Sequence, residues 1–142
     1  MTFCSQLVRG VDVSKEKDCK MENTEKRHYA VVDKYQRKLT LKRGEQVIVE
    51  SENALILKEV GKSVYNPVFY FPKGDLKVEL VKEPQRQSHC PIKGDATYWN
   101  FENTPTEAYF AWSYEDPLPR AKKIAGYLGF NMKDLTLVSE PI

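Results

Sequence analysis

The sequence predicts a mainly β domain in which two antiparallel sheets pack as an open barrel or sandwich, with one short helix near the C-terminus. Many short stretches alternate apolar and polar residues with a period of two, as half-buried strands do. Turn-forming residues interrupt these stretches at intervals of about ten residues. A helix start signal occurs only once. Together these patterns are typical of sheets packed face to face.

The chain has 142 residues, which is enough for one domain with a core and too few for two ordinary domains. Residues 1–26 are polar and contain no stretch that could bury itself, so we expect a disordered N-terminal extension. Residues 27–142 are expected to form the single β domain.

Charge and cysteine content limit the partners and the compartment. Charged residues make up 30% of the chain and the net charge is only +2, which argues against nucleic acid as a partner. The apolar runs are far shorter than the ~20 residues that cross a bilayer, and the N-terminus lacks a signal-peptide pattern. Three cysteines without a C-x-x-C pair favour a reducing compartment. We therefore expect a cytoplasmic protein without a membrane partner.

The first half of the domain is expected to contain strands only. Residues 46–50 and 54–57 are predicted to pair as a hairpin across a polar connection. The aromatic stretch at 67–72 has proline at both ends, which favours an edge strand. Residues 84–88 are predicted to be a loop. The other strands expected here are 29–32, 39–41 and 76–82.

In the second half, residues 89–90 and 96–99 are predicted to fold back on each other around the turn formers Pro91 and Gly94. A strand follows at 108–114. Asp116 before a proline predicts a capped helix over 117–125. Residues 127–130 and 135–138 are expected to close the fold as a hairpin.

The turn between residues 90 and 95 carries the candidate catalytic residues Cys90, Lys93 and Asp95. Cys90 is the candidate nucleophile or redox centre, and Lys93 would stabilise its thiolate or an oxyanion. Lys93 and Asp95 together would orient a polar ligand. In the alternative, Cys90 is a small buried hydrophobe and the Lys93–Asp95 pair is a surface ion pair worth ~0 to 1 kcal/mol. His89 should face away from Cys90, and His28 could serve as a base only if the fold carried it across.

Aromatic residues near this turn are the candidate ligand-binding residues. Pockets for small molecules are commonly walled by such rings and bordered by a few charged groups. Packing in the core is the alternative for each ring. No zinc ligand set of recognisable spacing occurs, so we expect neither a metal nor a cofactor. The residues assigned to the pocket are Tyr98, Trp99, Trp112, Glu115 and Tyr127.

Three motifs resemble the DUF427 family: HCPIKGDATYW at 89–99, AWSYEDP at 111–117 and IAGYLGF at 124–130. The resemblance covers roughly residues 45–138. It implies a tent-like β domain (β-tent) that lacks the zinc-binding cysteine pairs of other such domains. The family is functionally uncharacterised and sometimes carries a nucleotidyltransferase label. The sequence has no glycine-rich phosphate loop ahead of a helix and no aspartate pair spaced for magnesium.

The function expected from the sequence is binding of a small polar molecule in a pocket around this turn, with Cys90 assisting a reaction on it. A non-catalytic interaction or structural module is the alternative, in which exposed edge strands recruit a protein or a second copy as a homodimer. Nucleotidyl transfer is a further alternative, which only the family label suggests.

Overall fold

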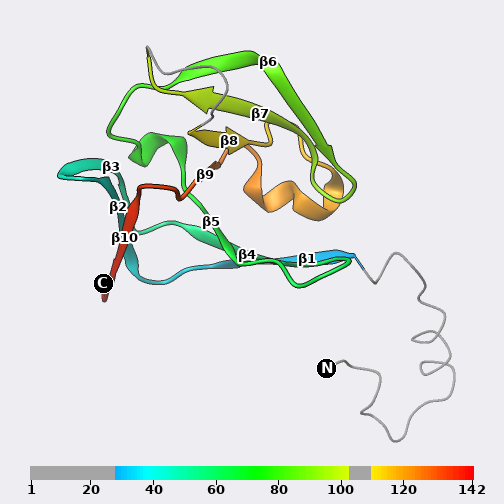
Figure 1. The fold of residues 1–142 in the computed structure, drawn as a ribbon. Coiled ribbons are helices and arrows are strands. Elements are labelled where there is room, and N and C mark those ends of the chain that lie inside the picture. The colour runs from blue at the N-terminus through cyan, green and yellow to red at the C-terminus, as the bar shows by residue number, and fades with distance from the viewer. Residues whose placement is uncertain (1–27, 103–109) are drawn as a thin grey trace, which may run out of the picture.

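The computed structural model describes residues 28–102 and 110–142. They form three antiparallel sheets (Figure 1). The first sheet has the strand order β1 (Tyr29–Lys34), β4 (Leu55–Val60) and β5 (Val68–Tyr70). The second has the order β10 (Thr136–Glu140), β2 (Lys38–Arg43) and β3 (Gln46–Ser51). The third has the order β6 (Val81–Cys90), β7 (Gly94–Asn100), β8 (Ala111–Ser113) and β9 (Leu128–Phe130).

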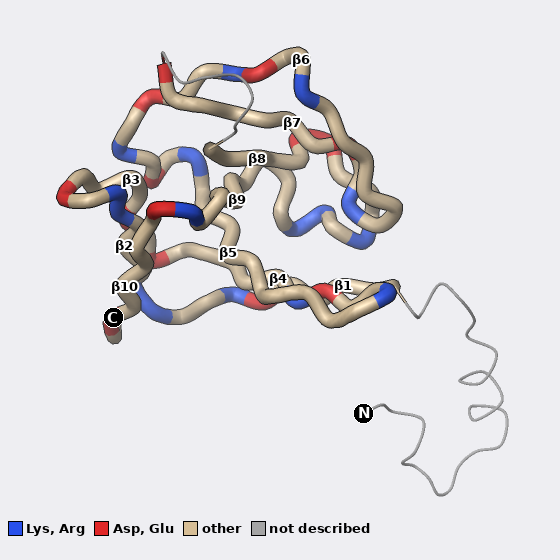
Figure 2. Tube along the Cα trace, viewed as in Figure 1, with Lys and Arg blue, Asp and Glu red and all other residues tan. Residues whose placement is uncertain are grey.

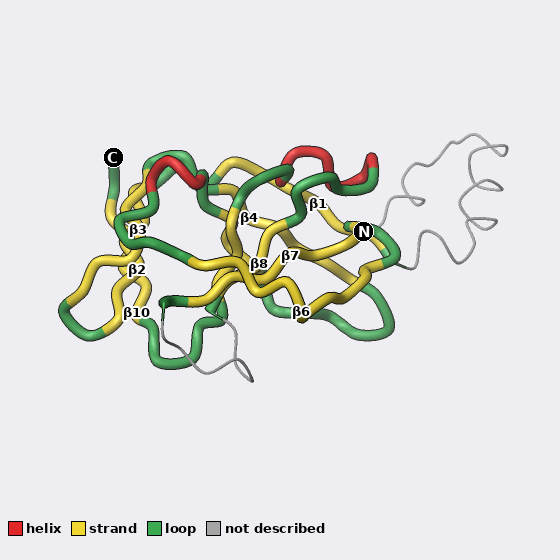
Figure 3. The backbone as a smooth tube through the Cα atoms, turned by 90° about the horizontal axis from the view of Figure 1, so that it is seen from above, coloured by secondary structure: helices red, strands yellow, loops and turns green. Residues whose placement is uncertain are grey.

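The sheets form an open sandwich. The four-stranded sheet β6–β9 lies over the β1–β4–β5 sheet, and η2 (Pro119–Ile124) fills one side between them next to β1 (Figure 1). The β10–β2–β3 sheet stands at the opposite end. Seen from above, strands make up most of both layers, and helix is confined to η2 and the short η1 (Lys73–Asp75) (Figure 3). The predicted mainly β fold is therefore confirmed.

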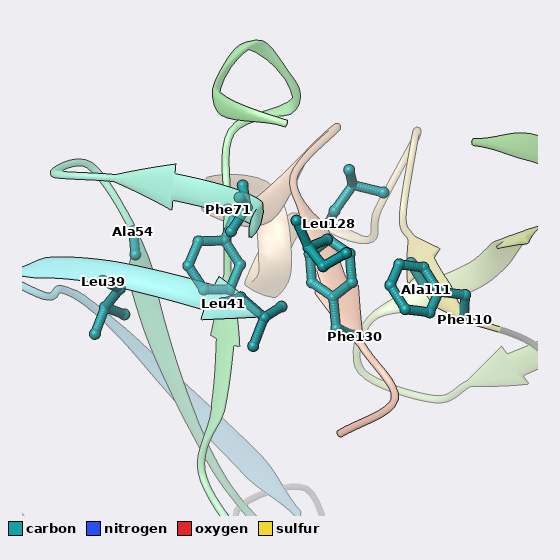
Figure 4. Packing of buried hydrophobic residues seen from close by; sticks show 10 residues of the cluster. Leu39, Leu41, Ala54, Phe71, Phe110, Ala111, Leu128 and Phe130 are labelled. Carbon is teal, nitrogen blue, oxygen red and sulfur yellow. The ribbon is translucent and has the colours of Figure 1, made fainter. Parts of the chain in front are cut away.

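Two buried clusters hold the layers together. In the first, Leu39 and Leu41 of β2 face the rings of Phe71 and Phe130, which meet edge to face at 5.7 Å between centroids (Figure 4). The second cluster lies between β4, β7 and η2 and includes Leu57, Ala96 and Ile124 among its buried members. The alternation of inward apolar residues along each strand supplies both clusters. The candidate site borders the second one.

Both predicted hairpins outside the central turn are wrong. β3 pairs with β2, whereas β4 joins β1 and β5 in a different sheet. The Ser51 hydroxyl donates to Asp75 at 2.6 Å and accepts from the Asn53 amide at 2.9 Å, which turns the chain out of the β3 sheet. At the C-terminus, β9 pairs with β8 and β10 with β2, so the two predicted partners belong to different sheets.

The strand predicted at 76–82 and the loop predicted at 84–88 are also wrong. Residues 76–80 form no strand in the described structure: Leu76 makes an isolated bridge to Val49, and the Lys77 amide donates to the Ile48 carbonyl. The strand β6 begins at Val81 and runs through 84–88, with a bulge in its pairing to β7 between residues 83 and 87. Pro84 has no N–H to donate to the ladder, and bulges are where sheets accommodate such a residue.

A helix exists where one is predicted near the C-terminus, but it is shorter and of the 3₁₀ type. η2 follows Leu118, no side chain caps it, and the predicted capping by Asp116 is wrong. Ala121 departs from helical geometry, and Gly126 with a φ of 75° follows the segment. In the described residues no helix is long and apolar enough to cross a membrane. The extension predicted at 1–26 lies outside the described residues.

Candidate functional site

The β6–β7 hairpin forms as predicted and presents the central turn to the neighbouring layer. Cys90 and Gly94 are cross-strand partners at its end. Gly94 has a φ of 103°, and a Cβ there would lie 3.3 Å from the Leu118 nitrogen. That same nitrogen donates to the Lys93 carbonyl at 3.0 Å. Glycine is therefore required both by the left-handed backbone and by the close approach of the Leu118 segment, which fixes the turn in place.

Strand alternation divides the residues of this motif between two faces. His89 and Asp95 are cross-strand partners whose side chains are 63% and 87% exposed, with 2.7 Å between Nδ1 and Oδ1. Lys93, by contrast, has a side chain only 12% exposed, and Cys90 is half-buried. The Lys93–Asp95 ion pair considered as the alternative does not form: Asp95 pairs with His89 on the exposed face, whereas Lys93 lies in the turn, before the left-handed backbone of Gly94, and its side chain is buried.

Lys93 instead belongs to a group of side chains that we call the inner cluster: His28, Glu59, Cys90 and Lys93. Lys93 Nζ donates to Glu59 Oε1 at 2.7 Å, and His28 Nε2 donates to Glu59 Oε2 at 2.8 Å. One donor atom from each of His28, Glu59 and Cys90 lies within 4.8 Å of the other two. Four kinds of reactive group thus meet at one place.

The register of β1 against β4 explains why His28 reaches this cluster. Ala30 is the cross-strand partner of Glu59, and His28 stands two residues before Ala30. The two side chains are therefore diagonal neighbours on one face of the sheet. Glu59 shares that face with the buried Leu55 and Leu57, so alternation points its carboxylate inward. A charged residue on the apolar face of a strand was the signal in the sequence that could have found it.

Two tyrosines lie beside the inner cluster. Lys93 Nζ is 5.7 Å from the centroid of the Tyr114 ring, and Tyr70 accepts a hydrogen bond from Trp112 Nε1 at 3.0 Å. Both tyrosines are buried, and burial raises the pKa of each hydroxyl above its ordinary value. They are therefore protonated hydroxyls at neutral pH, and each can donate a hydrogen bond.

The central ion pair is stable in its charged form. Burial pushes the pKa of Glu59 upward, but the hydrogen bonds from Lys93 and His28 outweigh it, and the pKa lies below its ordinary value. Burial pushes the pKa of Lys93 downward. The hydrogen bond to Glu59 and the electrostatic effect of the nearby Tyr70 outweigh burial, so the pKa of Lys93 lies above its ordinary value. The cluster holds one positive and one negative charge at neutral pH.

Comparison with protein families matches residues 31–140 to a family described as a domain of unknown function (DUF427). The chain belongs to the DUF427 family. No curated protein matches it. The residues that build the cluster on β4 and on the β6–β7 turn lie within the matched part of the DUF427 domain, whereas His28 lies just before it.

Three of the aromatic residues assigned to one pocket border different grooves of this DUF427 domain. Tyr98 and Trp112 are cross-strand partners on one face of the sheet, and Trp99 points to the other face. Trp99, Trp112 and Tyr127 border three separate grooves of about 310, 450 and 710 Å³. The groove beside the central turn, about 570 Å³, is lined on the outer face by residues that include His89 and Asp95.

Glu115 takes part in a different network of the DUF427 domain. It accepts hydrogen bonds from Lys73 Nζ at 2.9 and 2.8 Å and from the buried Ser113 hydroxyl, which itself accepts from Trp99 Nε1 at 3.0 Å. Lys73 Nζ also stands 5.2 Å from the Trp99 ring. Each of these polar groups has a partner. The network ties η1 to β7 and β8 and does not contact the inner cluster.

This network predicts a small pH-dependent contribution to stability. Burial pushes the pKa of Glu115 upward, but the bonds from Lys73 and Ser113 outweigh it and lower the pKa. A lowered pKa means that Glu115 stabilises the fold above its ordinary pKa and loses this effect as the pH falls through the folded-state pKa. We expect Glu115→Gln to reduce the free energy of unfolding by less than about 1 kcal/mol at pH 7, since the pair is partly exposed. Denaturant titrations should show this difference shrinking in acid; a difference constant with pH would contradict the prediction.

Basic and acidic residues are interspersed over both layers (Figure 2). This agrees with the net charge of +2, and none of the strands within residues 28–102 and 110–142 carries a long stripe of one sign. The inner cluster brings together a thiol, an imidazole, a carboxylate and an ammonium. This combination of reactive groups makes it the candidate functional site of the DUF427 domain.

Proposed function

We propose that the domain binds a small, neutral, polar molecule at the inner cluster and that Cys90 adds to an electrophilic carbon of that molecule. The convergence of Cys90, Lys93, Glu59 and His28 from separate segments supports the proposal. A buried ion pair is often no more stabilising than well-packed apolar residues of the same volume. An ion pair whose side chains are only 12% exposed is thus better explained by the chemistry it supports than by stability.

The roles follow from the contacts. His28 is held by Glu59, as the base of a nucleophile–base pair is held by a third group. In the addition, His28 takes the thiol proton, the sulfur–carbon bond forms, and the π pair of the carbonyl moves to oxygen. The proton then passes from His28 to that oxygen, which gives a thiohemiacetal without any other reactant. Lys93 is placed to stabilise the developing negative charge.

The charge of the cluster favours a neutral ligand. Lys93 and Glu59 cancel each other, so the site offers no excess positive charge. An aldehyde or an α,β-unsaturated carbonyl suits this site better than a phosphate ester, which needs unpaired cations. The same argument disfavours nucleotidyl transfer. A reducing, cytoplasmic environment would keep the Cys90 thiol available for this chemistry.

An interaction module without chemistry is the second candidate, and the edge of the β1–β4–β5 sheet supports it. In the part of the chain that the structure describes, β1 pairs only with β4, and Tyr29 and Val31 on it are both 45% exposed. Such an edge can add a strand from another protein or from a second copy of this chain.

The rate at which Cys90 reacts with neutral electrophiles tests the proposal. The full chain should carry Cys4→Ser and Cys19→Ser, so that Cys90 is the one remaining thiol. We expect Cys90 to react with iodoacetamide and with an enone faster than a free thiol does at neutral pH. His28→Ala should slow the reaction about 10²-fold, the lower end of what a positioned base contributes.

His89→Ala is the matched control, because His89 lies on the exposed face with Asp95. We expect its rate to equal that of the parent. Circular dichroism and thermal unfolding should show that each variant is folded. A parent rate no faster than that of a free thiol, or equal rates in the two histidine variants, would overturn the thiol-addition proposal and favour the interaction module.

A further inference from the structure

We propose that His28, Glu59 and Cys90 form a three-ligand site for a thiophilic divalent cation, with Zn²⁺ as the natural candidate. The site uses the inner cluster but goes beyond the proposed thiol addition and does not depend on it. From the sequence alone we expect no metal, because Cys90 with the neighbouring His89 makes no ligand set. The fold supplies His28 and Glu59 instead.

The donor atoms are close enough to share one ion. One atom from each residue lies within 4.8 Å of the other two, and His28 Nε2 lies 2.8 Å from Glu59 Oε2. Zinc takes nitrogen, oxygen and sulfur ligands at 2.0–2.3 Å, which places neighbouring donors about 3.5 Å apart in a tetrahedron. On metal binding, the distance between His28 and Glu59 would lengthen, and any longer distance between donor atoms of the three residues would shorten. Each change is about 1 Å, which rotation of the side chains can supply.

The kinds of donor select the metal. Cysteine sulfur with imidazole and carboxylate suits zinc, cobalt or cadmium, whereas magnesium and calcium prefer oxygen ligands alone. The Cys90 thiolate and the Glu59 carboxylate supply two negative charges against the divalent ion and the Lys93 ammonium, so the occupied site keeps a net positive charge. Three protein ligands leave a fourth position for water or a ligand, as in zinc sites that carry out reactions.

Lys93 would act as an outer-shell partner of this site. Its ammonium donates to Glu59 Oε1, which leaves Oε2 as the oxygen directed at His28. Outer-shell partners of this kind fix the orientation of a ligating carboxylate. A metal on Cys90 would also occupy the sulfur that the thiol addition needs. The cation and the electrophile would therefore be mutually exclusive occupants.

Cobalt and zinc titrations of the full chain carrying Cys4→Ser and Cys19→Ser test the site. We expect one Co²⁺ to bind and to give a sulfur-to-cobalt charge-transfer band that Zn²⁺ abolishes by displacement. Cys90→Ser should remove the band, and His28→Ala should weaken zinc binding by more than about 10²-fold, since even outer-shell losses cost 10–100-fold. The control His89→Ala should bind as the parent does.

Either of two results would overturn the proposal: a full chain that gives no charge-transfer band, or a zinc affinity unchanged in Cys90→Ser. His28→Ala is used because Glu59 variants are expected to unfold more easily. Alkylation distinguishes this inference from the proposed function. If the chain binds zinc but the metal-free Cys90 is unreactive, only the thiol addition is contradicted. If Cys90 is reactive but the chain binds no metal, only the metal site is contradicted.

Discussion

Replacing Glu59 with glutamine is expected to lower the free energy of unfolding by about 3 kcal/mol, the low end of the cost of breaking a buried ion pair. The side chains of Glu59 and Lys93 are each only 12% exposed and lie 2.7 Å apart. Glutamine keeps the shape but removes the charge, so the Lys93 ammonium stays buried without its counter-ion. His28 also loses its charged acceptor. Urea titration at neutral pH measures the change.

Two comparisons separate charge from shape in this prediction. The double variant Glu59→Gln with Lys93→Met should recover much of the loss, because no charge is then left buried. Glu50→Gln is the matched surface control: it removes the partner of Lys38 in an exposed pair and should cost far less stability than Glu59→Gln does. If Glu50→Gln and Glu59→Gln lost the same free energy of unfolding, the Glu59–Lys93 pair would behave like an exposed ion pair, and the prediction would be wrong.

Local signals in the sequence predicted the parts of the fold that are local. Pro91 and Gly94 determine the β6–β7 turn through their own backbone preferences, and the hairpin forms there as expected. The prolines at 67 and 72 confine β5 to a sheet edge, as their missing N–H groups require. In each case the physical cause lies within a few residues of the structure that it produces.

Long-range pairing could not be predicted in the same way. β10 pairs with β2 from the other end of the domain, and β4 pairs with β1 across the whole β2–β3 hairpin. The alternative considered from the sequence paired Lys93 with Asp95, two residues away. Lys93 pairs instead with Glu59, 34 residues away, because the turn and the left-handed Gly94 carry its side chain inward while Asp95 pairs with His89 on the exposed face. A polar residue on an apolar strand face shows that some partner is needed but not which one.

Tyr70→Ala is expected to destabilise the domain by about 3–5 kcal/mol, the usual cost of truncating a buried aromatic side chain. Tyr70 on β5 is 1% exposed and packs edge to face on Trp112 of the opposite sheet at 6.4 Å between centroids. Its hydroxyl also accepts from the indole of Trp112. Truncation would leave a cavity between the two layers next to the inner cluster. Guanidinium unfolding monitored by tryptophan fluorescence measures the loss.

Tyr70→Phe is the control that separates the ring from the hydroxyl. It keeps the packing on Trp112 and removes one hydrogen bond, so it should cost only about 1 kcal/mol. If both variants lost the same stability, the hydroxyl rather than the ring would join the layers at this point. The phenylalanine variant also takes a protonated hydroxyl away from the neighbourhood of Lys93 without opening a cavity. A change in Cys90 reactivity in this variant would therefore report on the polarity of the inner cluster rather than on the packing beneath it.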